Sequence, residues 1–133
     1  MSSRKILLVD DEPHVIRILR LVLERDGYLV QTANDGHEAL AMLEHYDPDV
    51  IISDIQMRGM DGRDLCRSVR QRYPASPCLI MIMTSMTAMD ERSWVKDLTN
   101  TEFFEKPLSP RQLIARLSAY FATQPCEPES HRA

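Results

Sequence analysis

Polar side chains stand at the ends of four short apolar runs in this chain, and their types suit phosphoryl chemistry. They are Asp10 and Asp11 after the first run, Asp54 and Thr84 at the ends of two later runs, and Lys106 after the last. A carboxylate can act as a nucleophile, further carboxylates can hold a cation, and a hydroxyl and an ammonium can contact phosphate oxygens. Because the runs are far apart in the sequence, this chemistry requires a fold that brings their ends together.

A divalent cation would be needed at such a site. Clustered carboxylates repel one another, and one of them takes up a proton unless a cation neutralises the cluster. Mg²⁺, or Mn²⁺ in its place, prefers oxygen ligands and is commonly held by one or two carboxylates together with phosphate oxygens. Phosphoryl transfer itself needs mainly an in-line nucleophile and positive charge on the equatorial oxygens. On this hypothesis Asp54 is the nucleophile, and the metal ion and Lys106 supply the charge.

The apolar runs themselves are predicted to be β-strands. They are Lys5–Val9, Tyr28–Thr32, Val50–Ser53 ending on Asp54, Cys78–Met83 and Glu102–Phe104. The first, third and fourth runs are almost continuously apolar, which is typical of strands that are covered on both faces in a parallel sheet. The sequence therefore favours buried parallel strands over the alternating strands of a half-exposed sheet.

Helical segments separate these runs. A broad apolar stripe runs from Val15 to Leu23 and closes at Gly27, and further helices are predicted from Asp35 through Leu43, after Asp61, from Asp90 to Leu98, and from Ser109-Pro110 through Phe121. Strict alternation of strands and helices demands a parallel sheet with helices on both faces, because each parallel return needs a right-handed crossover. The predicted fold class is α/β, a three-layer, doubly wound, five-stranded parallel sheet. Ligands of such sheets bind outside the carboxyl ends of the strands, where the polar residues stand.

Length and charge limit the organisation and the partners. The chain has 133 residues with 44% hydrophobic content, which suits one ordinary globular domain. Residues 1–122 are predicted to form this domain, and residues 123–133, with two prolines and several charges, a disordered tail. The net charge of -4 disfavours direct binding of nucleic acid by this chain.

The cysteines and the lengths of the apolar runs indicate the cellular compartment in which the protein is expected. Cys66, Cys78 and Cys126 have no metal-ligand spacing, and an odd number of cysteines without a secretory signal suggests reduced thiols. No apolar stretch approaches the roughly 20 residues that a membrane helix needs. The expected protein is soluble and cytoplasmic, with no membrane contact.

The site residues resemble the motif of the receiver domains of two-component response regulators, especially the chemotaxis-regulator-like ones. The resemblance covers about residues 4–121 and includes Met57 and the turn Met60-Asp61-Gly62. It implies a flavodoxin-like sheet with the strand order 2-1-3-4-5. It also implies a phosphorylation switch rather than a turnover enzyme, with at most self-phosphorylation from a donor and self-dephosphorylation.

The resemblance implies how the metal ion and the phosphoryl group are bound. Asp10 and Asp11 would bind the ion together with Asp54 and the backbone carbonyl of Gln56. Asp54 would accept its phosphoryl group from a histidine kinase or a histidine phosphotransfer protein. These roles come from the family pattern and not from the spacing of the residues alone.

The same resemblance implies a switch. Thr84 would hydrogen-bond the phosphoryl group, Lys106 would reach the same oxygens, and the Lys106-Pro107 bond would be cis. Movement of Thr84 would open space for the aromatic ring of Phe103, although a plain core aromatic is an equally open interpretation of that residue. The last two predicted helices and the strand between them would then form the face for a downstream partner, an effector domain or a second copy in a homodimer.

Two alternatives stay open at this point. Thr99-Asn100 replaces the glycine-containing turn that the family has before the fifth strand, so a degenerate receiver-like interaction module without phosphorylation is conceivable. A phosphohydrolase similar to the haloacid dehalogenases would also use an Asp nucleophile, a metal ion and a Lys. Those enzymes carry the nucleophile in an Asp-x-Asp pattern after the first strand, whereas this chain has Asp10-Asp11-Glu12 there.

Overall fold

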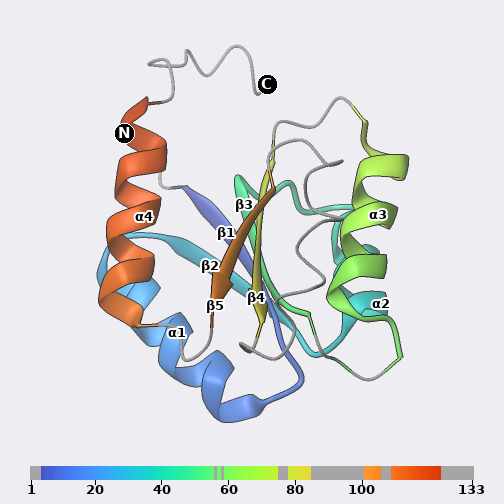
Figure 1. The fold of residues 1–133 in the computed structure, drawn as a ribbon, viewed down its shortest axis with the longest axis horizontal. Helices are drawn as coiled ribbons and strands as arrows, with labels where there is room; N and C mark the ends of the chain where they lie inside the picture. Colours follow the sequence, from blue (N-terminus) through green and yellow to red (C-terminus); the bar gives the residue numbers. More distant parts are fainter. Residues whose placement is uncertain are drawn as a thin grey trace.

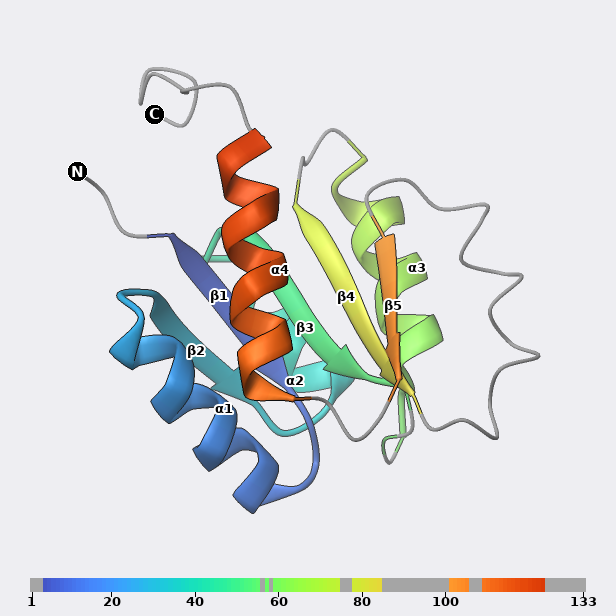
Figure 2. The same cartoon turned by 60° about the vertical axis from the view of Figure 1, so that its left-hand side comes forward.

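Five parallel strands form the central sheet in the spatial order β2-β1-β3-β4-β5 (Figure 2). The computed structural model describes residues 4–55, 57, 59–74, 78–84, 101–105 and 109–123. The strands are β1 (Lys5–Val9), β2 (Leu29–Ala33), β3 (Val50–Asp54), β4 (Leu79–Thr84) and β5 (Thr101–Glu105). The predicted α/β class and the flavodoxin-like strand order are confirmed. The order reverses between β1 and β3, which lie side by side.

Helices cover both faces of the sheet and complete the three layers (Figure 1). The helices are α1 (Pro13–Arg25), α2 (Gly36–Met42), α3 (Gly62–Arg72) and α4 (Pro110–Thr123). Helices α1 and α4 lie on one face, and α2 and α3 on the other. The helix predicted at Asp90–Leu98 falls outside the described residues.

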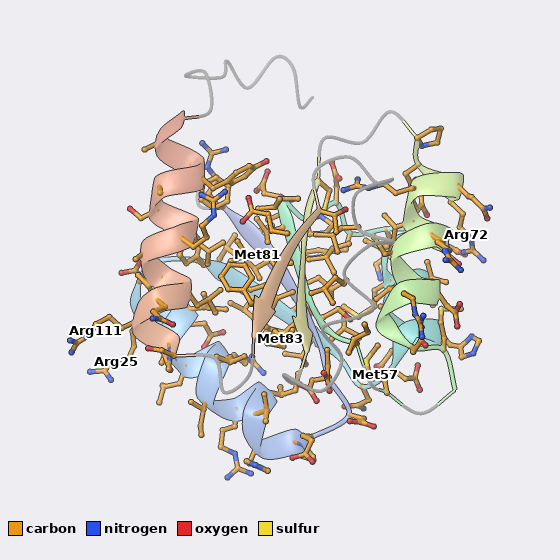
Figure 3. The ribbon with its side chains drawn as sticks, in the orientation of Figure 1. Arg25, Met57, Arg72, Met81, Met83 and Arg111 are labelled. Carbon is orange, nitrogen blue, oxygen red and sulfur yellow. The ribbon has the colours of Figure 1, made fainter. Side chains whose placement is uncertain are left out.

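Two separate hydrophobic clusters hold these layers together. Alternate residues of each strand point to opposite faces, so that Leu7 packs toward α2 and α3 whereas Ile6 packs toward α1 and α4. Figure 3 shows Met81 and Met83 in the layer between the sheet and α4, where both are buried. Burial of both faces of the central strands is what the continuous apolar runs predicted.

Local hydrogen bonds explain where α2 and α3 begin. The side chain of Asp35 accepts a bond from the Glu38 amide at 2.8 Å, and the Asp61 side chain accepts one from the Asp64 amide at 2.9 Å. Each carboxylate satisfies an amide that has no partner within its helix. Both caps were predicted from the sequence.

The end of α1 explains why β2 begins one residue later than predicted. Gly27 has a φ of 97°, its amide donates to the carbonyl of Glu24, and the Tyr28 amide donates to the carbonyl of Leu23. These two bonds form a Schellman cap, which requires a residue in the left-handed region. Tyr28 therefore belongs to the cap, and β2 starts at Leu29.

Other boundaries differ from the prediction by one or two residues. Strand β4 starts at Leu79 rather than Cys78, and α4 runs through Thr123, two residues past the predicted helix end at Phe121. Within the part of the chain that the structure describes, no helix is long and apolar enough to cross a membrane.

Burial of the Cys78 thiol predicts that the free energy of unfolding falls at alkaline pH. Cys66 and Cys78 are buried thiols, and burial raises the pKa of the Cys78 thiol from 9.0 to about 12, although the Arg70 guanidinium acts in the opposite direction. Below pH 9 the thiol is protonated in both folded and unfolded chains, but above it only the unfolded chain loses the proton. The free energy of unfolding should therefore fall by about 1.4 kcal/mol per pH unit between pH 9 and 12 from this group alone.

Urea unfolding at pH 7.5, 9 and 10 measures this dependence. Cys78→Ala should reduce the slope above pH 9, while the cavity left in the core shifts its whole curve downward. Parallel curves for the wild type and this variant would contradict the assignment.

Candidate functional site

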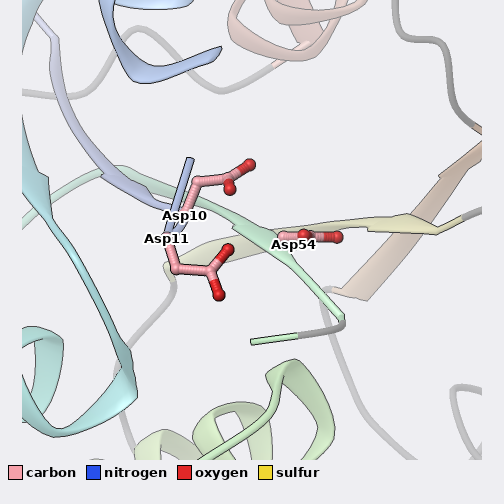
Figure 4. Close-up of side chains that lie close together, drawn as sticks. All are labelled: Asp10, Asp11 and Asp54. Carbon is pink, nitrogen blue, oxygen red and sulfur yellow. The ribbon is translucent and has the colours of Figure 1, made fainter. Parts of the chain in front are cut away.

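The carboxyl ends of β1 and β3 bring three carboxylates together (Figure 4). Val9 pairs with Ser53 in the register of these two strands. The residues that follow, Asp10 and Asp54, therefore come level with each other, and Asp11 lies next to them. The three side chains have ligand oxygens that all lie within 4.8 Å of one another.

The burial of the three carboxylates differs. Asp10 is 2% exposed and Asp54 4%, whereas Asp11 is partly exposed. Apart from Ser53, Asp10 and Asp54 are the buried polar residues in the described ranges. Two like charges at this depth repel each other strongly because little water screens them. The site therefore favours a bound cation, and the partly exposed Asp11 marks the side from which solvent enters.

Two hydrogen bonds hold Asp10 in place. The Asp10 amide donates to the carbonyl of Ala33 at 3.2 Å, which extends the pairing of β1 with β2 by one residue. The Oδ1 atom of Asp10 accepts a bond from the Glu12 amide at 2.9 Å, close to the start of α1. This bond fixes one carboxylate oxygen toward the helix start.

Two hydrogen bonds within the sheet hold the backbone around Asp54. The hydroxyl of Ser53, which is fully buried, donates to the carbonyl of Asp54 at 2.9 Å. The Ile55 amide donates to the carbonyl of Met83 at 2.9 Å, so β3 stays paired with β4 past its last residue. The bonds of Ser53 and Ile55 thus fix the backbone to which the Asp54 carboxylate is attached.

The donor set fits Mg²⁺ or Mn²⁺. All three groups offer oxygen, which suits these hard cations and not the softer metals that select thiolates. Two ligands on one Mg²⁺ ion stand at most about 4.2 Å apart, twice the usual bond length. Oxygens within 4.8 Å reach that spacing by small rotations of the side chains. A set of two or three carboxylate ligands also leaves coordination positions on the ion for water and for a phosphate oxygen.

The remaining predicted site residues are placed only in part. Thr84 is the last residue of β4, and Phe103 lies within β5, but their side chains are outside the described part of the structure. Asp54 pairs with Met83 in the register, which puts the Thr84 backbone one residue beyond that level. Gln56, Lys106 and Pro107 also lie outside the described residues, so their predicted roles stay predictions.

One residue of the site was not singled out by the sequence. Ser53 is fully buried, and its hydroxyl contacts the backbone of Asp54. A single polar residue at the end of the run Val50-Ile51-Ile52 was the available signal. Its meaning depends on a backbone contact that the order of the residues does not reveal.

Comparison with protein families gives a match over most of the chain. The model of the response regulator receiver domain matches residues 6–118. The alkaline phosphatase synthesis transcriptional regulatory protein PhoP of Bacillus subtilis (strain 168) is 37% identical over 117 residues, which are 88% of this chain and 48% of that protein. The chain thus spans about half the length of this relative.

Solved structures share the fold over nearly the same region. The chemotaxis protein CheY4 of Vibrio cholerae is 32% identical, with a TM-score of 0.81 over 89% of this chain and 98% of that one. A CheY-like receiver domain protein of Methanospirillum hungatei JF-1 has a TM-score of 0.83 at 23% identity, over 91% of this chain and 95% of that one. At this lower identity the likeness concerns the fold alone.

Proposed function

The chain belongs to the response regulator receiver domains, and from this we propose that it is a switch that accepts a phosphoryl group on Asp54. The observation that carries the proposal is the meeting of Asp10, Asp11 and Asp54 at the carboxyl ends of neighbouring strands. A carboxylate nucleophile beside two further carboxylates is an arrangement that suits metal-dependent phosphoryl transfer.

The proposed reaction is a transfer from a phosphohistidine. An oxygen of Asp54 attacks the phosphorus, the O–P bond forms, and the P–N bond breaks with its electron pair returning to the imidazole nitrogen of the donor. Hydrolysis reverses the switch when water attacks the phosphorus and the carboxylate leaves, releasing inorganic phosphate. The protein acts as an acceptor that resets itself rather than as a turnover enzyme.

Asp10 and Asp11 hold the cation in this proposal, with Asp54 and the backbone carbonyl of Gln56 as further ligands. When bound, Mg²⁺ or Mn²⁺ supplies positive charge to the phosphate oxygens. The bond from the Glu12 amide to one oxygen of Asp10 limits rotation of this carboxylate. The partial exposure of Asp11 leaves a path for the phosphodonor.

Thr84, Lys106 and Phe103 report the phosphorylated state in this proposal. Thr84 hydrogen-bonds the phosphoryl group and Lys106 neutralises its oxygens, while Phe103 repacks when Thr84 moves. On this proposal the Lys106-Pro107 bond would be cis, as the resemblance to the receiver family implies.

The output face comprises the predicted helix Asp90–Leu98, β5 and α4. It contacts a downstream protein, an effector domain or a second copy of the chain. The donor is a histidine kinase or a histidine phosphotransfer protein in the cytoplasm. The relative from Bacillus subtilis is named as a transcriptional regulator, and control of transcription through a separate effector fits this scheme, since the acidic charge of this chain disfavours direct contact with DNA.

Labelling with a small phosphodonor tests the proposed function. Wild-type protein incubated with acetyl phosphate and Mg²⁺ should gain one acid-labile phosphoryl group, detected by intact mass spectrometry. Excess EDTA should lower the labelling rate by roughly 100-fold or more, because the carboxylate cluster without a cation repels the anionic donor.

Two other outcomes would redirect the assignment. No labelling, together with a melting temperature that Mg²⁺ leaves unchanged, would favour the interaction module that does not respond to phosphorylation. Repeated turnover of a phosphate ester would favour the phosphohydrolase.

A further inference from the structure

The first residue of α3 touches the backbone of the proposed phosphoacceptor. The Gly62 amide donates to the carbonyl of Ile55 at 2.8 Å. A Cβ atom at Gly62 would lie 2.6 Å from the carbonyl oxygen of Asp54 and 2.8 Å from the Cα atom of Ile55. Both distances are shorter than real Cβ contacts, and both neighbours are main-chain atoms that cannot rotate away.

Space, and not backbone conformation, requires a glycine at this position. The described glycines with positive φ are Gly27 and Gly59, and Gly62 is not among them. Any residue could therefore adopt its φ, and alanine would favour the helix more. The absence of a side chain at Gly62 allows the start of α3 to pack closely against the end of β3.

Gly36 offers a matched comparison within the same molecule. It is the first residue of α2, follows the capping Asp35, and stands in the same Asp-Gly pattern as Asp61-Gly62. A Cβ atom at Gly36 would meet the Cγ and Sδ atoms of Met60 at 2.9 Å and its Cβ atom at 3.0 Å. The Cγ and Sδ atoms belong to an unbranched, flexible side chain and can move, and no main-chain atom is among these contacts.

The sheet leaves the Asp54 backbone little freedom to yield to a clash. Its carbonyl accepts the bond from Ser53, and the next amide is bonded to Met83 across the sheet. A methyl group on Gly62 must therefore push back the start of α3, displace the Asp54-Ile55 peptide, or both. The second movement changes the position of the Asp54 carboxylate relative to Asp10 and Asp11.

The geometry points to Gly62 as a positioning residue for Asp54, an inference that rests on the proposed function. Contact between the bare Cα of Gly62 and the Asp54-Ile55 peptide sets the position of the acceptor carboxylate relative to the metal ligands. A displacement on the order of 1 Å can slow an oriented reaction by about 100-fold.

The test compares three variants with the wild type: Gly62→Ala, Gly36→Ala and Leu117→Ala. Leu117 is fully buried on α4, in the cluster on the other face of the sheet, so its truncation lowers stability without touching the site. The labelling rate with acetyl phosphate at saturating Mg²⁺ is divided by the folded fraction from urea curves in the same buffer. Calorimetric titration gives the Kd for Mg²⁺.

Gly62→Ala should label roughly 10- to 100-fold more slowly per folded molecule and bind Mg²⁺ more weakly. Gly36→Ala and Leu117→Ala should stay within about twofold of the wild type in both quantities. A merely structural role for Gly62 would make it resemble Leu117→Ala, with stability lost and the rate per folded molecule retained. That result would overturn the inference.

Two further outcomes keep the test decisive. If Gly62→Ala does not fold in buffer, trimethylamine N-oxide is added to favour the compact state, and folded but slowly labelled protein supports the inference whereas a wild-type rate overturns it. Failure of the wild type itself to label would instead contradict the proposed function. The Kd for Mg²⁺ would then still show whether Gly62 positions the carboxylate.

Discussion

Replacement of Asp54 by Asn is expected to reduce phosphoryl labelling to background while the protein stays folded. The amide has nearly the same shape as the carboxylate but lacks the negative oxygen that attacks phosphorus. The bonds donated by the Ser53 hydroxyl and the Ile55 amide around this position do not involve the Asp54 side chain, so the strand end keeps its geometry. Intact mass spectrometry after incubation with acetyl phosphate and Mg²⁺ measures the loss.

Asp49 provides the control for this substitution. It directly precedes β3, at the end of the strand opposite to Asp54, where its Oδ2 atom accepts a bond from the Lys5 amide at 2.8 Å. Asp49→Asn removes the same charge from the same stretch of chain and should label at the wild-type rate. Labelling of Asp54→Asn at a comparable rate would place the acceptor on another residue and end the proposal.

Replacement of Asp10 by Asn is expected to weaken Mg²⁺ binding by roughly 100-fold or more and to slow labelling in proportion. Asp10 is 2% exposed, so its charge acts on the cation with little screening by water. The Asn side chain keeps an oxygen that can accept the bond from the Glu12 amide, which preserves the local backbone. The loss should therefore report the charge and not a change of shape.

The stability of this variant should respond to Mg²⁺ far less than that of the wild type. Without metal, the loss of one like charge from the cluster should raise the free energy of unfolding by on the order of 1–3 kcal/mol. At a Mg²⁺ concentration of 100 times the Kd of the wild type, the free energy of unfolding should rise by about 2.7 kcal/mol for the wild type and by almost nothing for the variant. Urea unfolding with EDTA and with Mg²⁺ measures both.

Glu12 is the matched control for Asp10. It follows in the same acidic run, but its side chain is 54% exposed and stands 3.5 Å from His14 rather than in the cluster. Glu12→Gln should bind Mg²⁺ within about twofold of the wild type. Equal losses in the two variants would mean that general negative charge, and not a defined set of ligands, attracts the cation.

The fold was predictable from local patterns because each pattern has a local physical cause. Continuous apolar runs mark strands that are buried on both faces, and Asp35 and Asp61 begin helices by capping exposed amides. The boundaries were less predictable. The cap at Gly27 drew Tyr28 out of β2 through a bond to Leu23, and such a bond depends on how the helix ends in space.

The candidate site was predictable as a set of positions but not as a geometry. Asp10, Asp11 and Asp54 stand at strand ends in the sequence, and parallel strands place their carboxyl ends at one edge. Their spacing within 4.8 Å follows from the register of β1 against β3, which pairs Val9 with Ser53. Register is a property of two paired strands, so neither strand's sequence contains it alone.

Periodicity and residue type along the chain were sufficient to predict the class of the fold, the order of its elements and the chemical types at the strand ends. Which groups share one site, and which contacts hold them there, became apparent from the packing of the folded chain. The roles of Ser53 and Gly62 belong to this second group. A buried hydroxyl and a missing side chain acquire meaning only through the backbone that packs against them, and that backbone comes from another part of the chain or from the turn that follows it.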